Sequence, residues 1–387
     1  MQTPLRRTWS EIDLDNLAYN FEAIRRCVGA DTKLLGVVKG DAYGHGAVHV
    51  ARKLAELGAA YLAVSNDEEA AEIRGAGVQL PILILGCTPS DQSERILSLD
   101  ITQTVADLET ARAYDAAAGR AGKRMKVHVK LDTGMGRLGF QCDDEHFDES
   151  LRDILAVLSL PNLDVEGVFT HFAVADEDTP EAEAFTRMQH ERFVRMANET
   201  EKIAGFRFRL RHCCNAGGIA FHPEWAGDMA RCGILLYGTG ELAERLSLRP
   251  VMRLKTVVSA IKQFDAGVPI SYGRTFYTQS HARIAVLPIG YADGLHRALS
   301  NLLVVRTPCG EARQVGRICM DMCMIDVTEQ PDLKVGDEVE VYGEHMLCET
   351  AAKLCGTISY ELLSAVSRRV PRLYFEHGVQ IDRVNRL

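Results

Sequence analysis

Residues 33–57, KLLGVVKGDAYGHGAVHVARKLAEL, contain the pattern from which the fold can be inferred. A short apolar run, Lys33–Val38, is followed by a glycine-rich loop and then by an apolar repeat at helical spacing that includes Val50 and Leu54. A second short apolar run follows at Tyr61–Val64. Strand, helix and strand in this order predict one unit of a parallel sheet.

The same alternation continues through the first two-thirds of the chain. Further helical repeats are Leu14, Leu17, Phe21 and Ile24 on one face, and Phe185, Met188, Phe193 and Met196 on another. Six more short apolar runs complete a set of eight: Ile82–Leu85, Ile101–Val105, Met125–Leu131, Leu163–Phe169, Phe206–His212 and Met229–Tyr237. Eight strands separated by helices predict an α/β fold, a (β/α)8 barrel of the TIM type. An open, doubly wound sheet is the alternative, because a sequence does not show closure.

After Leu246 the pattern changes to short alternating runs separated by glycine turns, which indicates a second, mainly β domain. The runs are VMRLKTVVSAIKQF, ARIAVLPI, NLLVVRT, MCMIDVT and DEVEVYG. We therefore expect a barrel domain over residues 1–245 and a mainly β domain over residues 246–387, with residues 1–10 packing on the latter.

Composition limits the possible partners of the chain. The 387 residues carry a formal net charge of −9, whereas nucleic-acid-binding proteins usually have an excess of basic residues. No apolar run is long enough to span a bilayer, and the start of the chain lacks the apolar stretch of a secretory signal. The 11 cysteines follow no zinc-binding spacing, which predicts reduced thiols and no metal site. We expect a cytoplasmic protein that binds neither nucleic acid nor membrane.

Lys39 directly follows the first predicted strand, at the end of a parallel barrel where active sites lie. Partial desolvation at this position would lower the pKa of the amine and leave it free to form an imine. Gly40, Gly44 and Gly46 would let the backbone approach a ligand closely. A solvated lysine at a strand end is the alternative, which position alone does not exclude.

Polar residues also lie at the ends of later strands, namely Arg137, His171, Asn215 and Arg231. Each has an ordinary structural explanation by itself, such as a turn, a core histidine or an arginine paired with a carboxylate. Together they form the polar cluster that a cofactor site requires. The glycine turns after Asn215 and at Gly233-Ile234 would offer backbone N–H groups to a phosphate.

Several motifs in the chain resemble those of the alanine racemases. They are VVKGDAYGHG (37–46), KLDTGMGRLGF (130–140), ARCGILLYG (230–238), ISYGRTF (270–276), PIGYADG (288–294) and GRICMD (316–321). The resemblance extends from Trp9 to Tyr374 with the motifs in order. It implies an isomerase that uses pyridoxal 5′-phosphate (PLP) to interconvert L-alanine and D-alanine, a peptidoglycan precursor.

In the first domain, the resemblance implies roles toward PLP. Lys39 would hold the cofactor as an imine and act as one of two bases. The other implied contacts are Tyr43, Asn215, Ala216, Gly233 and Ile234 at or near the phosphate, Arg137 at the phenolic oxygen and the substrate, His171 beside the ring and Arg231 at the pyridine nitrogen. Lys130 matches a position that is carbamylated in many relatives and braces the arginine.

One departure from the family concerns the phosphate. The family usually has Asn-Ser-Ala where this chain has Asn215-Ala216-Gly217, so a hydroxyl donor is missing and Ala216 offers only its backbone.

An arginine at the ring nitrogen, the role implied for Arg231, affects which reaction the cofactor favours. An arginine that stays protonated cannot give the ring nitrogen a proton, and the resulting weaker electron sink favours racemisation over transamination.

In the second domain, the resemblance implies the remaining half of the site. Removing a proton from one face of the substrate and returning one to the other needs a second acid–base group. Tyr272 matches the family's catalytic tyrosine, which comes from the partner subunit of a head-to-tail homodimer. Met320 and Asp321 match residues at the substrate carboxylate, Tyr291 an entrance residue, and Tyr360 a phosphate ligand.

Three alternatives to an alanine racemase stay open at this point. A serine or broad-specificity racemase would use the same scaffold, although Tyr360 favours alanine. A PLP decarboxylase would need a site for a long side chain, for which no motif is present. A non-catalytic PLP carrier would lack the second domain and its tyrosine.

Overall fold

The computed structural model describes residues 7–385, and these divide into two compact units. The barrel unit comprises Phe21–Ala42 and Ala47–Leu236. The β unit comprises residues 7–20, Tyr43–Gly46 and 237–385. The domain boundary expected between residues 245 and 246 stays a prediction; β11, the first strand of the β unit after the barrel, begins at Met252.

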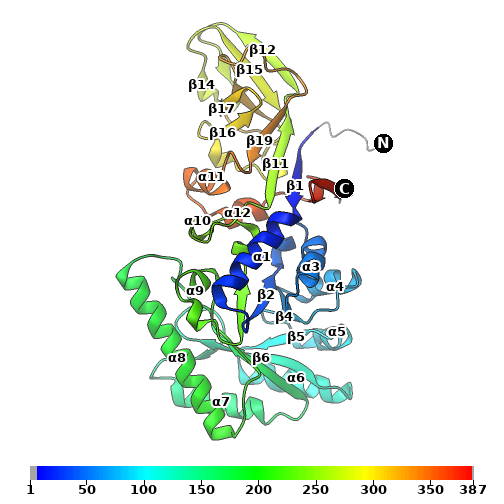
Figure 1. Cartoon of the computed structure of the whole chain (residues 1–387), viewed down its shortest axis with the longest axis vertical. Coiled ribbons are helices and arrows are strands. Elements are labelled where there is room, and N and C mark those ends of the chain that lie inside the picture. Colours follow the sequence, from blue (N-terminus) through cyan, green and yellow to red (C-terminus); the bar gives the residue numbers. More distant parts are fainter. Residues whose placement is uncertain (1–6, 386–387) are drawn as a thin grey trace. The chain divides into compact units, whose positions relative to one another are not determined.

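The barrel unit contains eight parallel strands in the order β10-β2-β3-β4-β5-β6-β8-β9. Figure 1 labels β2, β4, β5 and β6 of this set. The ring closes between β9 and β10, where the Arg231 N–H donates to the Cys214 carbonyl (3.1 Å) and the Asp228 N–H to the Arg211 carbonyl (3.1 Å). The predicted barrel is therefore confirmed. The strands are β2 (Lys33–Val37), β3 (Tyr61–Val64), β4 (Ile82–Ile84), β5 (Thr102–Val105), β6 (Met125–Asp132), β8 (Leu163–Phe169), β9 (Leu210–His212) and β10 (Met229–Cys232), with β7 (Phe140–Gln141) pairing β6 alone.

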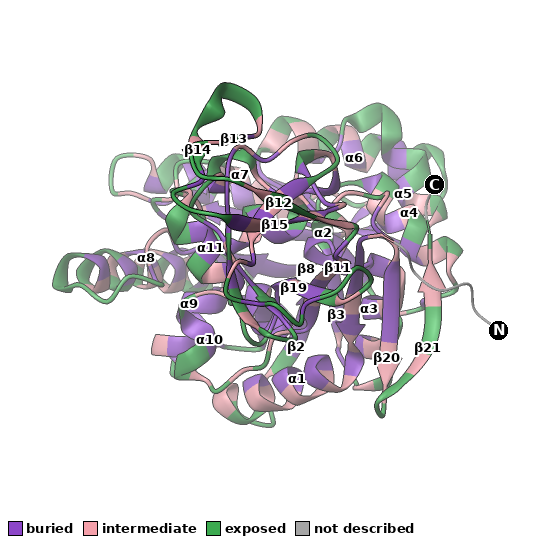
Figure 2. Ribbon diagram, turned by 90° about the horizontal axis from the view of Figure 1, so that it is seen from above, coloured by how far each residue is buried: buried purple, intermediate pink, exposed green. Residues whose placement is uncertain are grey.

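Helices follow most of these strands and begin at capping residues that the sequence supplies. Asn66, Asp107 and Thr179 accept backbone N–H groups at the starts of α4, α6 and α8, where each cap satisfies an otherwise unpaired donor. The helices up to the end of the barrel are α1 (Leu14–Val28), α2 (Lys39–Tyr43), α3 (Ala47–Glu56), α4 (Asp67–Gly75), α5 (Ser93–Ser98), α6 (Leu108–Arg120), α7 (Phe147–Leu158), α8 (Pro180–Ala204) and α9 (Ala216–Phe221). Figure 2 shows buried strands in the centre and helices with exposed outer faces.

Apart from strand ends that differ by one residue, the predicted elements of the barrel unit differ from the observed ones in three places. Residues 206–209 precede β9 as a loop, because the Arg209 N–H bonds to the Glu166 carbonyl outside the regular ladder. β10 ends at Cys232, and Ile234–Tyr237 form a 3₁₀ turn. Phe185, predicted on the buried face of its helix, is 37% exposed.

The β unit is built on a ten-stranded sheet of order β12-β15-β18-β17-β16-β19-β11-β1-β20-β21. Its β1 pairs antiparallel with β11 and parallel with β20, so a segment near residue 10 lies between strands from the second half of the chain. The strands are β1 (Trp9–Asp13), β11 (Met252–Val257), β12 (Ala260–Phe264), β15 (Ala282–Leu287), β16 (Val304–Thr307), β17 (Gly310–Gln314), β18 (Cys323–Asp326), β19 (Glu338–Tyr342), β20 (Arg372–Glu376) and β21 (Val379–Val384). A separate ribbon pairs β13 (Pro269–Ile270) with β14 (Phe276–Tyr277), and α10 (Leu242–Arg245), α11 (Cys348–Leu354) and α12 (Ser359–Ser364) complete the unit.

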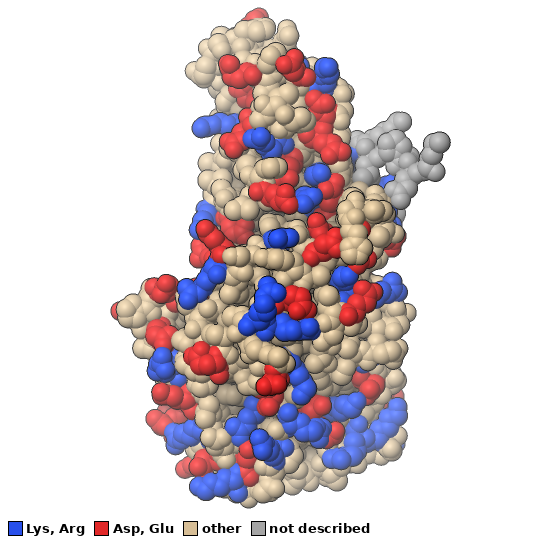
Figure 3. Space-filling view, in the orientation of Figure 1, with Lys and Arg blue, Asp and Glu red and all other residues tan. Residues whose placement is uncertain are grey.

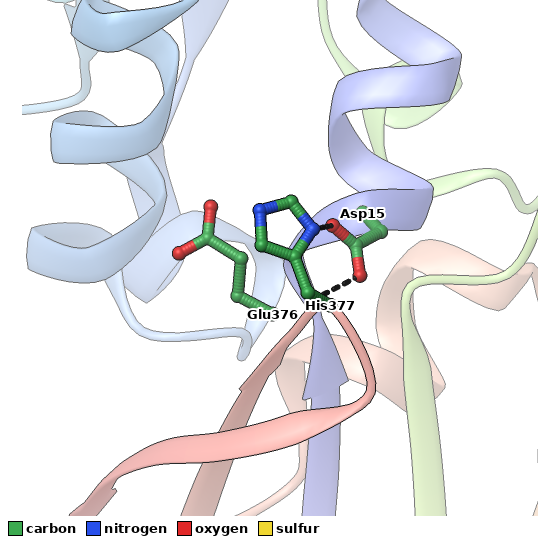
Figure 4. A group of neighbouring side chains, drawn as sticks. All are labelled: Asp15, Glu376 and His377. Atoms are coloured by element: carbon green, nitrogen blue, oxygen red, sulfur yellow. Dashed lines mark hydrogen bonds and ion pairs between the residues drawn. The ribbon is translucent and has the colours of Figure 1, made fainter.

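Asp15, Glu376 and His377 form a cluster of potential metal ligands in the β unit (Figure 4). The Asp15 carboxylate accepts the His377 backbone N–H at 2.6 Å and lies 3.3 Å from its Nδ1. These contacts join the start of α1 to the turn between β20 and β21, which explains the cluster without a metal.

The surface of the described residues carries charge of both signs. Basic side chains on the face of the barrel unit drawn in Figure 3 are interspersed with acidic ones. Between residues 7 and 385, no helix has the length and apolar character needed to cross a bilayer.

Candidate active site

A left-handed turn follows Lys39 at the carboxyl end of β2. Gly40, Asp41, Ala42 and Tyr43 have φ of 63°, 55°, 54° and 54°, a conformation that glycine adopts freely but that costs each of the other three roughly 1–2 kcal/mol. Three hydrogen bonds within the barrel unit hold its first part: Ala42 N–H to the Val38 carbonyl (2.8 Å), Gly40 N–H to the Glu69 carboxylate (2.7 Å) and Ala47 N–H to the Asp41 carboxylate (2.8 Å). Backbone strain of this kind gathers at functional sites.

Lys39 has an altered acidity although its side chain reaches solvent. Desolvation by the surrounding barrel is the main cause that lowers the pKa of its amine, and the positive charge of Arg137 lowers it further. Glu69 opposes this shift. The expectation of a partly desolvated lysine at this strand end is thereby met, and a larger neutral fraction makes the amine a better nucleophile.

Lys130 lies on β6 and is only 4% exposed. Its Nζ sits 4.6 Å from the centre of the Phe169 ring, and no carboxylate among the described residues forms an ion pair with it. Burial, followed by the charges of Arg231 and Arg137, lowers the pKa of Lys130 well below its usual value. Lys39, Lys130, Arg137 and Arg231 thus form one cationic region at this end of the barrel.

Arg231 on β10 is 3% exposed, and its guanidinium is held from several sides. Its Nη1 donates to the His212 carbonyl (3.1 Å), and its Nη2 donates to the carbonyls of Thr170 (2.8 Å) and Cys213 (3.0 Å). Its Nη2 also lies 3.2 Å from His171 Nδ1. Within the described part of the chain, Nε is the one guanidinium nitrogen without a hydrogen-bond partner, so it remains available to a ligand.

His171 is held neutral beside Arg231. Burial and then the charges of Arg231 and Lys130 lower its pKa well below the usual value. Because an arginine can only donate, His171 Nδ1 accepts from Arg231. The His171 carbonyl is fixed in turn by the Gln189 side chain at 3.2 Å.

A glycine turn lies between β9 and α9. Asn215 caps α9 by accepting the Gly218 N–H at 3.1 Å. The N–H groups of Ala216 and Gly217 begin the helix and have no intrahelical acceptor. A Cβ on Gly217 would come within 2.3 Å of Ala175, so the close packing of this turn requires glycine. Gly233 and Ile234 begin a second turn of this kind after β10.

Arg137 lies on a loop that the Asp132 carboxylate shapes. Asp132 accepts the N–H groups of Gly134 (3.0 Å), Gly136 (3.1 Å) and Arg137 (3.1 Å). The Arg137 side chain is exposed at the carboxyl end of β6. Its loop thus presents a cation at the same strand ends as Lys39, whose pKa it lowers.

Tyr43 and Tyr360, both expected near the phosphate, meet in the β unit. The Tyr43 ring lies 5.9 Å from the Tyr360 ring and 4.9 Å from the Tyr237 ring. Burial and the neighbouring Tyr360 raise the pKa of Tyr43, so its hydroxyl stays protonated at neutral pH and can donate a hydrogen bond.

Tyr272 is 71% exposed and opens a short turn after β13. Ser271 before it has φ of 69° and donates a hydrogen bond to the Arg317 carbonyl (2.6 Å). Tyr272 also lines a cavity of about 440 Å³ together with Ser271 and Cys319. An exposed phenol on a fixed turn can reach a partner molecule, and its position relative to Lys39, in the other unit, stays a prediction.

Tyr291, Met320 and Asp321 lie on two loops that are hydrogen-bonded to each other. The Tyr291 N–H donates to the Cys319 carbonyl (3.0 Å), and the Ala292 N–H donates to the Met320 carbonyl (3.0 Å). The structure therefore brings these three predicted residues together.

The sequence analysis missed the ion pairs that hold these loops. Asp293 is fully buried and binds Arg7 and Arg369, each at 2.8 Å, and Arg369 reaches Asp321 at 2.6 Å. The signal available was an acidic residue inside PIGYADG and an arginine pair at 368–369, but a sequence does not show which charges pair.

The closed parallel barrel, the lysine of lowered pKa, the glycine turns and the separate β unit together define a two-domain enzyme with its active site at the strand ends of a barrel. Comparison with known proteins gives the family. Family models described as the N-terminal and C-terminal domains of alanine racemase match residues 12–241 and 251–374.

Full-length relatives agree with this assignment. The chain is 43% identical to alanine racemase 2 of Caldanaerobacter subterraneus subsp. tengcongensis, covering 99% of this chain and 98% of the relative. It is 42% identical to the alanine racemase of Clostridium perfringens, covering all of both chains. The solved alanine racemase structure of Clostridium difficile 630 superposes with a TM-score of 0.92 at 40% identity, covering 99% of each chain. The chain belongs to the alanine racemase family, and the comparisons do not favour the alternatives raised by the sequence.

Proposed function

We propose that the chain binds PLP and interconverts L-alanine and D-alanine through two acid–base groups, Lys39 and Tyr272. The observation that carries this proposal is the presence, in one unit, of a lysine of lowered pKa and a buried arginine whose Nε has no hydrogen-bond partner among residues 7–385. Family membership supports the substrate class, a small amino acid.

The donors of the barrel unit fit the chemical groups of PLP. Lys39 would hold it covalently, and Arg231 Nε would face its ring nitrogen. The free N–H groups of Ala216 and Gly217, and those of Gly233 and Ile234, would bind its phosphate with Asn215 shaping the turn. The hydroxyls of Tyr43 and Tyr360 would add to these donors and compensate for the missing serine, while Arg137 and His171 would lie along the ring.

When bound, PLP supplies an electron sink that acidifies the Cα–H of an attached amino acid. Lys39 Nζ would take or return a proton on one face, and the Tyr272 phenol would do so on the other. Burial lowers the pKa of Arg231 to about 10, so the guanidinium stays charged at neutral pH and donates a hydrogen bond without losing its proton. This limits the sink, which favours rapid return of the proton.

We also propose that a head-to-tail homodimer completes the site, with Tyr272 of one subunit reaching the barrel of the other. The 71% exposure of Tyr272 and the apolar exposed side chains near it, Met320 (53%) and Met322 (46%), support an interface at this face. Met320, Asp321 and Tyr291 would then line the approach of the substrate carboxylate. Free cysteines support a reducing, cytoplasmic location.

The test is a chiral assay of purified protein with added PLP, comparing L-alanine with L-serine. We expect equilibration of both alanine enantiomers and slower turnover of serine. Serine turnover should still be detectable, because a small pocket discriminates against one added hydroxyl only weakly, by roughly 100-fold at most. Faster turnover of serine than of alanine would overturn the substrate assignment.

Lys39→Ala tests the covalent attachment. A lysine imine of PLP should absorb near about 420 nm, and we expect the variant to lose this band together with racemisation. A band of unchanged position and intensity would exclude Lys39 as the attachment point.

A further inference from the structure

A row of buried polar side chains crosses the barrel interior from Arg231 to the first residue of β3, Tyr61. Arg231 Nη1 lies 3.3 Å from His212 Nδ1, and His212 Nε2 lies 2.9 Å from His128 Nδ1. His128 Nε2 lies 3.5 Å from the Glu166 carboxylate, which also accepts a hydrogen bond from the Tyr61 hydroxyl. Both histidines are fully buried, and neither has a role in the proposed chemistry.

The chemistry of the two ends fixes the direction of every hydrogen bond in this row. Arginine has only donors, so His212 Nδ1 must accept and His212 must carry its proton on Nε2. That proton is donated to His128 Nδ1, which leaves the His128 proton on Nε2. The Nε2–H then lies 3.5 Å from the Glu166 carboxylate, which can only accept when ionised; the two groups form no regular hydrogen bond at this distance, so Glu166 acts on His128 through its charge.

The backbone around the row makes room for these side chains. In the pairing of β6 with β8, Val127 faces Val165 and His128 faces Gly167, so Glu166 is the extra residue of a bulge. Bulges re-aim a side chain, often beside active sites. A Cβ on Gly167 would lie 2.8 Å from both Cε1 and Nδ1 of His128, so only glycine leaves space for the imidazole.

The charges along the row are also defined. Burial opposes ionisation of Glu166, but the nearby His128 and the hydrogen bond from Tyr61 lower its pKa to about 2. Burial lowers the pKa of both histidines, which keeps them neutral. Arg209 is the other charged group that faces Glu166, at 4.0 Å. No carboxylate among residues 7–385 forms an ion pair with Arg231, so the row connects it to the negative charge of Glu166.

We propose that Glu166 is a positioning residue of the racemase, acting through His128 and His212 to keep a lone pair on His212 directed at Arg231. The guanidinium is thereby held with Nε turned to the ligand. The inference rests on the proposed function for its effect on racemisation, but the proton positions it requires belong to the protein alone. A core filled for packing only would be apolar, because each buried polar group must find a partner.

The test is Glu166→Gln, with Asp164→Asn as the matched control. A carboxamide can donate to His128 Nε2, so it no longer imposes one direction on the row. The control removes a carboxylate from the same strand, where Asp164 pairs with the exposed Arg209 (2.9 Å) and with no other cation among residues 7–385. The first readout is ¹⁵N NMR of histidine-labelled protein without PLP. We expect Nδ1 of His128 and His212 to be unprotonated in the wild type and D164N, and partly protonated in E166Q.

The second readout is the steady-state kinetics of alanine racemisation. We expect kcat of E166Q to fall roughly tenfold, the scale of one hydrogen bond to a charged group, with KM unchanged and D164N like the wild type. Unchanged protonation or unchanged kcat in E166Q, with an active wild type, would overturn the inference. An inactive wild type would instead overturn the proposed function.

Gly167→Ala serves as a second variant if E166Q does not fold. Its added methyl would displace the His128 ring while leaving Glu166 in place, and we expect the same change at His212 Nδ1 and the same fall in kcat. If Gly167→Ala leaves both the protonation of His212 Nδ1 and kcat at their wild-type values, the inference is overturned.

Discussion

Arg137 and Lys39 show how one charge can set the reactivity of another at the scale of single residues. The guanidinium lies on the loop after β6, yet after desolvation it is the largest cause of the lowered pKa of Lys39. Glu69, which fixes the strained turn through the Gly40 N–H, acts in the opposite direction. The pKa of Lys39 thus depends on two opposing charges: Arg137 on the loop after β6 lowers it, and Glu69, which holds the turn, raises it.

Arg137→Gln should raise the pKa of Lys39, because it removes a neighbouring positive charge. The neutral fraction of the amine at pH 7 would fall, and imine formation between PLP and the PLP-free protein would move to higher pH. The measurement is the rate of appearance of the imine band as a function of pH. Arg137→Lys keeps the charge and should leave the profile in place; a shift equal in both variants would assign the effect to lost packing.

Lys130→Met should stabilise the protein at neutral pH. Lys130 is buried without a carboxylate, and the pKa in the folded state lies well below 10.5. The unfolded state therefore binds more protons between these two pKa values, and wild-type stability rises with pH through that window. The variant should lack this rise and gain about 1–4 kcal/mol at neutral pH.

Chemical denaturation at several pH values tests this prediction, with Lys126→Met as a control. Lys126 lies on the same strand, but its side chain is 43% exposed and pairs with Asp100 (3.1 Å), so its replacement should change stability by less than about 0.5 kcal/mol. Destabilisation by Lys130→Met would contradict an amine at this position and favour a carbamylated, negatively charged Lys130.

At the scale of elements, apolar periodicity located all eight barrel strands because each lies in a short, mainly apolar run and most are followed by a helical repeat. It did not locate β1 and β20, which pair with each other although they are remote in sequence, or β21, a largely exposed strand that pairs with the neighbouring β20. The left-handed turn after Lys39 was not predicted, because its glycines were interpreted as allowing close approach to a ligand and Ala42 and Tyr43 do not favour positive φ. The row from Arg231 to Glu166 was not predicted either, because its members come from strands that only closure of the barrel brings together.

Two glycines of this left-handed turn differ in what surrounds them, which gives a graded prediction. Gly40 has φ of 63° and open space where a Cβ would lie, whereas a Cβ on Gly44 would come within 2.2 Å of the Leu363 carbonyl oxygen. Gly40→Ala should therefore cost about 1 kcal/mol of unfolding free energy, for the backbone alone. Gly44→Ala should cost clearly more, because backbone must shift. Equal losses in urea denaturation would contradict the contact.

At the scale of the whole molecule, a site shared between subunits predicts complementation of two inactive variants. Tyr272→Phe should keep the imine band and lose racemisation, whereas Lys39→Ala should lose both. In a dimer of one variant subunit with the other, one of the two sites would combine an intact Lys39 with an intact Tyr272. Random mixing should restore about a quarter of wild-type activity, because half the dimers would be mixed and half their sites intact.

The measurement is racemisation after the two variants are unfolded and refolded together, with each refolded alone as the control. If both groups came from one chain, no combination would carry an intact pair and the mixture would stay inactive. That outcome would remove the shared site from the proposal while leaving the roles of the two residues open to separate assay.

The path of the chain between its two units has a consequence for dissection. The backbone leaves the β unit after residue 20, returns for Tyr43–Gly46 and returns again at residue 237. No single cut yields two self-sufficient modules, since a fragment ending at Leu236 would carry β1 without β11 or β20. A gene encoding only the first half would therefore produce β1 without its partner strands, and the loop Tyr43–Gly46, which follows the reactive lysine in sequence, without the rest of the β unit.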